Sequence, residues 1–128
     1  MEADINGTQR KVVSCVVAPV RRAHGTDGIV VRDGKTLPFA VTREWSAPAG
    51  HYDERWYLVN PETREVLYES NARDVLIWGL QSLTELTDRG AEPITLPPGK
   101  YSIVFALGGI MGGEFEIEAL EAPSEEAA

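Results

Sequence analysis

Cysteine and long apolar runs are almost absent from this sequence. Cys15 is the only cysteine among 128 residues, so no disulfide can form within the chain. No apolar stretch approaches the ~20 residues that a membrane-spanning helix needs, and the polar residues 1–11 lack the apolar core of a signal peptide. These absences lead us to expect a soluble, cytoplasmic protein that does not use a membrane as a partner.

Basic charge is scarce as well. The chain has 20 acidic and 12 basic residues, which gives a formal net charge of -8 at pH 7. Its one basic cluster is Arg21 with Arg22, and Arg10 with Lys11 lies one strand length upstream. Because nucleic acids and anionic membranes are bound through basic patches, we expect neither as a partner. Solubility alone explains the surplus of acidic side chains.

The sequence also lacks a metal-binding motif. Its two histidines are His24, with Asp27 nearby, and His51, with Asp53 and Glu54 nearby. Imidazole and carboxylate groups can together hold zinc or iron, but neither spacing matches a known ligand pattern. Both histidines fall in turn-like segments, where solvent exposure explains them. We therefore expect no metal and no other cofactor.

Signatures of covalent and phosphate chemistry are missing too. Cys15 lies among valines without a neighbouring cation to activate it, which is the setting of a core thiol. No Gly-x-Ser-x-Gly motif occurs, and the glycine-rich run 108–113 lacks the order of a phosphate-binding loop. We interpret this run as a wide hairpin whose glycines relieve strain, with a mobile rim beside a ligand as the alternative. We lean against an enzyme, although a triad assembled only in space stays open.

Strand patterns, in contrast, are abundant. Valine is concentrated in residues 11–20, and β-branched residues favour strands. The dipeptide at 33–34, Asp-Gly, predicts a β-hairpin because both residues suit a two-residue turn, and residues 60–63 predict a second hairpin with a type I turn. Apolar residues alternate along 101–107 and, against glutamates, along 114–118. We interpret these glutamates as charges that block edge-to-edge strand pairing, with contact to a basic partner as the alternative.

These patterns predict a mainly β fold, an antiparallel β-sandwich or small barrel of about seven or eight strands. We assign residues 11–121 to a single β-rich domain, residues 1–10 to a flexible arm and residues 122–128 to an acidic disordered tail. The six residues 96–101, LPPGKY, resemble the turn that leads into a strand in many immunoglobulin-like and carrier-type sandwich domains. That short resemblance implies a fold and no activity.

One segment carries the signals of a helix. Asn71 can cap its start and Gly90 can end it, and its apolar residues repeat at helical spacing on one face. We therefore predict one inserted α-helix at about 72–89. The apolar run 75–78 is also compatible with a buried strand, because periodicity cannot decide so short a run. In the helix, Trp78 would project from the polar side, where a large aromatic indicates an interface.

Aromatic and acidic residues crowd one predicted loop, which contains Trp45, His51, Tyr52, Asp53 and Trp56. Aromatic rings beside carboxylates suit a sugar site. The same composition is typical of aromatics that plug one end of a sandwich, because large rings bury much apolar area. The candidate ligand-binding or partner-binding residues are these five together with Trp78.

Two hypotheses for the function follow. The first is a non-enzymatic interaction module that binds a protein partner, or a second copy of itself, through exposed aromatics. The alternative is a small-molecule binding protein or enzyme, with carbohydrate as one ligand class, whose site is the loop 44–57. Aromatic enrichment without a catalytic motif favours the first hypothesis.

Overall fold

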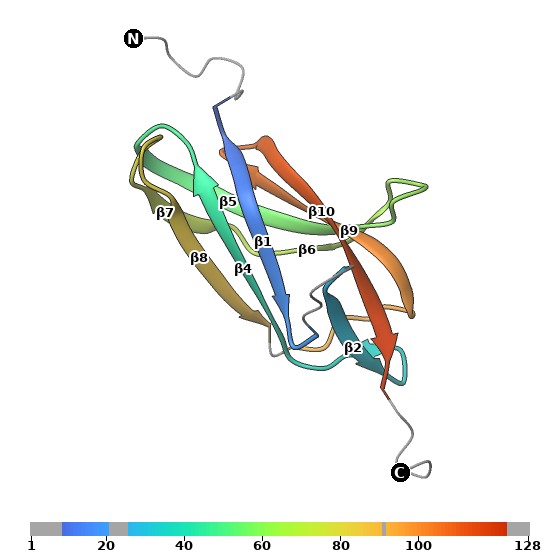
Figure 1. Ribbon diagram of the computed structural model, residues 1–128. Helices are drawn as coiled ribbons and strands as arrows, with labels where there is room; N and C mark the ends of the chain where they lie inside the picture. Colours follow the sequence, from blue (N-terminus) through green and yellow to red (C-terminus); the bar gives the residue numbers. More distant parts are fainter. Residues whose placement is uncertain (1–8, 21–25, 91, 123–128) are drawn as a thin grey trace.

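The structure, a computed structural model, describes residues 9–20, 26–90 and 92–122. In this part of the chain, ten strands form two sheets (Figure 1). They are β1 (Lys11–Ala18), β2 (Gly28–Arg32), β3 (Lys35–Thr36), β4 (Phe39–Ser46), β5 (Gly50–Val59), β6 (Val66–Glu69), β7 (Arg73–Ile77), β8 (Thr84–Gly90), β9 (Gly99–Leu107) and β10 (Ile110–Glu121). The described residues contain no helix, and hence no helix able to cross a membrane. The prediction of a mainly β fold is confirmed.

The two sheets curl around a shared interior. The smaller sheet has the order β1-β4-β8, with both pairs antiparallel. The larger sheet has the order β3-β2-β10-β9-β5-β6, and β7 pairs with the first half of β5. Strands β2 and β10 pair in parallel. Figure 1 shows the smaller sheet lying across the larger one, so that together they form a half-barrel.

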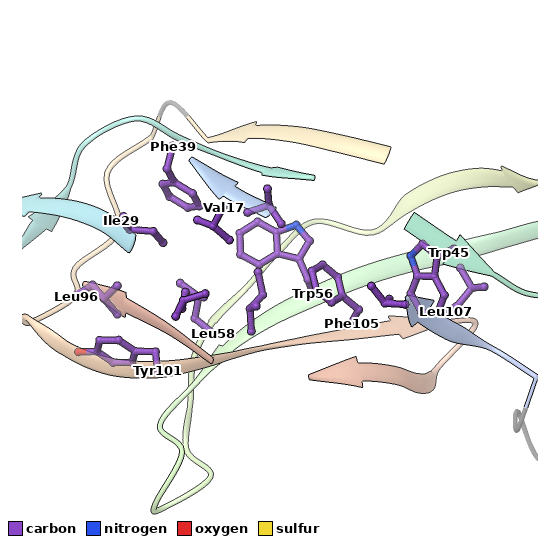
Figure 2. Close-up of a cluster of buried hydrophobic side chains, with 14 of the residues drawn as sticks. Val17, Ile29, Phe39, Trp45, Trp56, Leu58, Leu96, Tyr101, Phe105 and Leu107 are labelled. Carbon is purple, nitrogen blue, oxygen red and sulfur yellow. The ribbon is translucent and has the colours of Figure 1, made fainter. Parts of the chain in front are cut away.

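Alternating burial explains why these segments are strands. Along β4, every second residue from Phe39 to Trp45 is buried and the residues between are partly exposed. The interior receives side chains from both sheets (Figure 2); the large ones include Phe39, Trp45, Trp56, Leu58, Phe105 and Leu107. The rings of Phe39 and Trp56 meet edge to face, with centroids 6.3 Å apart. Apolar burial across the two sheets therefore holds the fold together without a covalent link.

The predicted helix at 72–89 is wrong. This segment forms β7, a turn at 78–83, and β8, and the alternative of a strand near 75–78 is confirmed for Val75 to Ile77. Val75 and Ile77 point into the core while Leu76 between them is exposed, which is the two-residue period of a strand. The capping signals are local and weak, and pairing of β7 with β5 and of β8 with β4 overrides them.

Both predicted hairpins are confirmed. Asp33 and Gly34 have positive φ angles of 54° and 76° and join β2 to β3, as a two-residue turn of this type requires. In the β5–β6 turn, the Asn60 side chain accepts hydrogen bonds from the backbone N–H groups of Glu62 and Thr63. The predicted arm and tail stay predictions, because residues 1–8 and 123–128 lie outside the described part of the chain.

Candidate functional site

Three turns lie together at one end of the molecule, the upper end in Figure 1. They are the β4–β5 turn at 47–49, the β7–β8 turn at 78–83, and the β9–β10 turn at Gly108 and Gly109. A Cβ atom placed on Gly79 would lie 3.9 Å from the Cβ of Ala49, so the first two turns are neighbours. The Gly108 N–H donates to the Asp53 carbonyl (2.7 Å), which fixes the third turn against β5. Most of the candidate residues lie at this end.

Trp45 and Trp56 belong to the core. Their exposed fractions are 0% and 4%, so neither ring can meet a ligand at the surface. The Trp45 indole N–H donates to Glu54 Oε2 (2.5 Å), and the Trp56 indole N–H donates to Asp88 Oδ2 (2.8 Å). The interpretation of these two aromatics as a structural plug fits their position, and the interpretation as ligand contacts does not.

A buried ionic cluster accepts those indole hydrogen bonds. The Arg43 guanidinium, from β4, binds both Glu54 carboxylate oxygens, with Nε 2.8 Å from Oε2. It also lies 3.4 Å from Asp88 Oδ2, and Arg73 contacts the other Asp88 oxygen at 2.5 Å. Burial opposes ionisation of Asp88, but the hydrogen bond from Trp56 and the charge of Arg43 outweigh it and lower the Asp88 pKa. The cluster joins the two sheets and has every polar partner it needs, so its role is structural.

Sequence reasoning missed this cluster, although a signal was present. Arg43 stands between Val41 and Trp45 at the inward positions of an alternating strand, and Glu54 precedes Trp56 in the same way. A charged residue at an inward position calls for a buried partner of opposite charge.

His51, Tyr52 and Asp53 come together in a surface depression of about 530 Å³. It is also lined by Arg10, Arg55, Tyr57 and the two-glycine turn at 108–109. The Tyr52 hydroxyl donates to the Pro48 carbonyl (2.9 Å), and the Arg10 guanidinium lies over the Tyr52 ring, 4.9 Å from its centroid. The depression thus brings these three residues beside the two-glycine turn.

Several polar groups of the depression contact groups just outside it. Arg10 Nη1 donates to the Leu107 carbonyl (2.8 Å), and Arg55 is paired with Glu69. His51 Nδ1 lies 3.7 Å from Asp74 Oδ2, with both side chains largely exposed. Arg10, Arg55 and His51 thus each lie beside an acceptor that does not itself line the depression.

The glycine-rich run is a tight turn and not a wide one. Gly108 and Gly109 have φ angles of 60° and 81° and form the two-residue turn between β9 and β10, a conformation that favours glycine. Gly112 is required for a different reason. A Cβ atom there would lie 2.6 Å from Cη2 of Trp45 and 2.9 Å from the Arg10 carbonyl. The run therefore shapes the hairpin and seats the Trp45 ring.

Trp78, unlike the two buried tryptophans, is strongly exposed, with 66% of its surface accessible. Around it Leu76, Leu80 and Leu83 are exposed by 44%, 47% and 48%. We call these four residues the tip cluster. Sequence analysis placed Trp78 outward because of a helix that does not exist. Its exposure has another cause, since Trp78 follows Leu76 on the outward positions at the end of β7 and its N–H donates to Thr84 Oγ1 (3.0 Å).

The remaining candidates stay apart from this end or carry no chemistry. Burial, and next the nearby charge of Asp27, raise the pKa of the Cys15 thiol to about 12, which suits a core thiol and not a nucleophile. Among the described residues, no group of three or more histidine, cysteine, aspartate or glutamate side chains is placed to hold a metal. His24 and the basic pair Arg21 and Arg22 lie outside the described residues.

The glutamate row on β10 is only partly an edge feature. Glu114 forms a bidentate pair with Arg64, at 2.7 Å and 2.8 Å, and this pairing lowers the Glu114 pKa. Glu118 lies where β10 pairs with both β9 and β2. We interpreted Glu114, Glu116 and Glu118 as charges that block pairing at a free strand edge. This interpretation is wrong for Glu118, because β10 has a neighbouring strand on both sides there.

Comparisons with known proteins give the fold and no more. No protein-family model and no curated protein matches this chain. Among solved structures, Pseudomonas fluorescens alkylpurine DNA glycosylase AlkC bound to DNA containing an abasic site analog is similar over 88% of this chain, with 16% identity and a TM-score of 0.54. The beta-glucosidase from Listeria innocua in complex with isofagomine has 12% identity over 85% of this chain and a TM-score of 0.45. This chain spans 30% of the glycosylase and 16% of the glucosidase.

Proposed function

We propose that this chain is an immunoglobulin-like β-sandwich module that binds a protein partner and does no chemistry of its own. Features of the strands support the sandwich type. The Tyr101 hydroxyl donates to the Pro97 carbonyl (2.5 Å), as in the tyrosine corner of such domains. Trp56 is buried on β5, a strand of the larger sheet with partners on both sides, and these domains also place a core tryptophan on a strand of one sheet. Loops at one end of immunoglobulin variable domains form the binding surface, which is an analogy of fold.

The observation that carries the proposal is the exposure of the tip cluster. Roughly 150 Å² of Trp78 is exposed if its whole side chain presents about 230 Å². Burying that area would contribute about 4 kcal/mol at ~25 cal/mol per Å². Tryptophan is also the residue most enriched among those that dominate binding energy at interfaces. Leu76, Leu80 and Leu83 add exposed apolar area on the same β7–β8 turn, and exposed apolar surface of this kind marks interaction sites.

The tip cluster is too small for a stable dimer by itself. Four partly exposed side chains offer on the order of 400 Å², whereas a stable protein–protein interface buries about 800 Å² on each partner. We therefore favour a partner with a pocket that receives Trp78 over self-association of two copies through this surface.

A pair of matched variants tests the proposal. Trp78→Ala removes the anchor, and Val66→Ala removes another exposed apolar side chain, on β6 (53% exposed). The assay is affinity capture from extract with wild type, Trp78→Ala and Val66→Ala as baits. The amount of captured partner should fall at least tenfold with Trp78→Ala and stay unchanged with Val66→Ala. Light scattering should find wild type monomeric. A partner retained equally by both variants would refute the role of the tip cluster.

The depression at His51, Tyr52 and Asp53 supports a second candidate, a site for a small molecule such as a carbohydrate. The supporting observation is the convergence of these residues with Tyr57 on one concave surface. A thermal-shift screen of sugars and nucleotides checks it, because a bound ligand stabilises the folded state by RT ln(1 + [L]/Kd). A shift that disappears in Asp53→Asn supports a ligand at this depression, and an unchanged melting temperature across the panel argues against it.

A further inference from the structure

We propose that the segment bound at the tip cluster is basic as well as apolar, a stretch of protein with lysine or arginine beside apolar side chains. The inference rests on the proposed function, in which the tip cluster is a binding surface. It goes further by naming the chemistry of the partner from the charges that flank the cluster.

Two pairs of carboxylates flank the tip cluster, one on each sheet. On the larger sheet, Asp53 of β5 lies directly opposite Asp74 of β7. On the smaller sheet, Glu44 of β4 lies directly opposite Glu85 of β8. The Cβ atoms of directly opposed strand residues are about 5 Å apart, and like charges at this separation repel. Each pair therefore generates a negative potential beside the apolar surface.

Each carboxylate pair has one member two residues away in sequence from a leucine of the tip cluster. Leu76 follows Asp74 by two residues on β7, so the two side chains share the outer face of the larger sheet. Glu85 comes two residues after Leu83, at the start of β8. A segment lying across Trp78 would thus meet carboxylates on both sides of its apolar contact.

The arginines near the two carboxylate pairs have other partners, and Arg10, which lines the depression beside Asp53, donates to the Leu107 carbonyl. Arg73 is paired with Asp88, Arg55 with Glu69 and Arg43 with Glu54. Within the described residues, no lysine or arginine forms an ion pair with either flanking carboxylate pair. The other polar contacts are a hydrogen bond from Ser14 Oγ to Glu44 (2.7 Å) and the approach of His51 to Asp74.

Charge complementarity therefore selects the occupant. A cationic side chain from a partner would relieve repulsion in both carboxylate pairs, whereas an acidic partner would add to it. The net charge of -8 acts in the same direction at longer range and speeds the encounter with a cationic segment. The exposed face of the Trp78 ring is also a favourable neighbour for a lysine or arginine head group.

Three dye-labelled synthetic peptides of equal length and without tryptophan serve as probes. One alternates leucine with lysine, one alternates leucine with glutamate, and one alternates serine with lysine. Fluorescence anisotropy gives the affinity. Tryptophan emission reports burial of Trp78, because Trp45 and Trp56 are already in the core. Wild type should bind the leucine–lysine peptide at least tenfold more tightly than either other peptide at low salt, with a blue shift of the emission.

Two double variants separate local charge from total charge. The double variant Asp74→Asn with Glu85→Gln should bind the leucine–lysine peptide with an affinity at least threefold lower than that of wild type. Glu62→Gln with Glu65→Gln removes the same total charge from the exposed β5–β6 turn, which projects from the opposite side of the molecule in Figure 1, and should leave binding unchanged. The difference between the two doubles should shrink at 1 M salt, where the Debye length is about 3 Å.

The outcomes distinguish the inference from the function on which it rests. Equal binding of the leucine–lysine and leucine–glutamate peptides, lost in Trp78→Ala, would keep the tip cluster as a contact and overturn the basic partner. Equal weakening by both double variants would overturn it as well. Failure of every peptide to bind, or binding unaffected by Trp78→Ala, would refute the proposed function itself. A blue shift on neutral phosphatidylcholine vesicles that exceeds the shift with every peptide would make a lipid surface the occupant and overturn the inference.

Discussion

Removal of Glu54 should be among the most damaging single changes in this protein. Its carboxylate accepts hydrogen bonds from two nitrogens of Arg43 and from the Trp45 indole, and its side chain is buried between the sheets. In Glu54→Leu these donors lose their acceptor, and the Arg43 charge stays in the core. Breaking a buried ion pair on one side typically costs about 3–5 kcal/mol. That cost is a large part of the free energy of unfolding of a typical domain, which is about 5–15 kcal/mol.

Replacement of both partners should cost far less. In Arg43→Met with Glu54→Leu no charge is left unpaired, and apolar residues of similar size fill the space. Such replacements of a buried ion pair are often neutral or stabilising by 1–4 kcal/mol. The measurement is urea unfolding of wild type, both single variants and the double variant, from which a coupling free energy is obtained. We expect a coupling of at least about 2 kcal/mol between Arg43 and Glu54.

The exposed pair Arg55 and Glu69 provides a matched control, since it joins neighbouring strands of one sheet with both side chains in contact with water. Arg55→Met with Glu69→Leu should show a coupling below about 1 kcal/mol. If the losses of unfolding free energy at Arg43 and Glu54 simply add, or if their coupling is no larger than that of the control pair, the view that the two sheets depend on this pair is refuted.

Three further predictions follow from other parts of the structure. Gly112→Ala should destabilise the fold by roughly 1–3 kcal/mol because its methyl group would overlap the Trp45 ring, and an unchanged urea midpoint would contradict this close approach. The pKa of Asp88 is lowered in the folded state, so its contribution to stability is complete above the ordinary pKa of 3.8 and is lost as the pH falls through the lower folded-state value. Urea midpoints should therefore fall less steeply toward pH 2 in Asp88→Asn than in wild type, and equal slopes would contradict the assignment. With its pKa near 12, Cys15 should react with iodoacetamide at pH 8 on the order of 10³-fold more slowly than an ordinary thiol. Alkylation at the rate of free cysteine would contradict the burial of this thiol.

The features predicted well from the sequence are those set by neighbouring residues. The Asp33-Gly34 turn and the alternation along β9 depend on local conformation and on a two-residue period, and both are visible in the chain. The helix at 72–89 failed because its evidence was equally local. Its leucines fit a helical face, but Leu80 and Leu83 lie exposed in a turn, and the strands on either side are held by pairing with residues distant in the chain, as Gly90 pairs with Phe39, 51 positions away.

The candidate site was predicted in part for the same reason. His51, Tyr52 and Asp53 are consecutive, so their common location needed little knowledge of the fold. Whether Trp45 and Trp56 are buried depends on which faces of the two sheets pack together. That packing is set by the whole chain and not by neighbouring residues. The Arg43 and Glu54 pair escaped notice because each charge marks an inward position only once its strand and the face of that strand are known.

The link between the sheets has a practical consequence. Many immunoglobulin-like domains, the class proposed for this chain, join their two sheets by a disulfide, and their stability then depends on the redox state of the surroundings. Here Arg43 of β4 forms a salt bridge with Glu54 of β5. Its guanidinium also lies over the Phe105 ring of β9, with the guanidinium carbon 5.7 Å from the ring centroid. The connection between sheets is electrostatic and indifferent to reductants. The module should therefore be a convenient scaffold for presenting grafted turns at the 78–83 end inside reducing cells, where disulfide-dependent domains lose their cross-link.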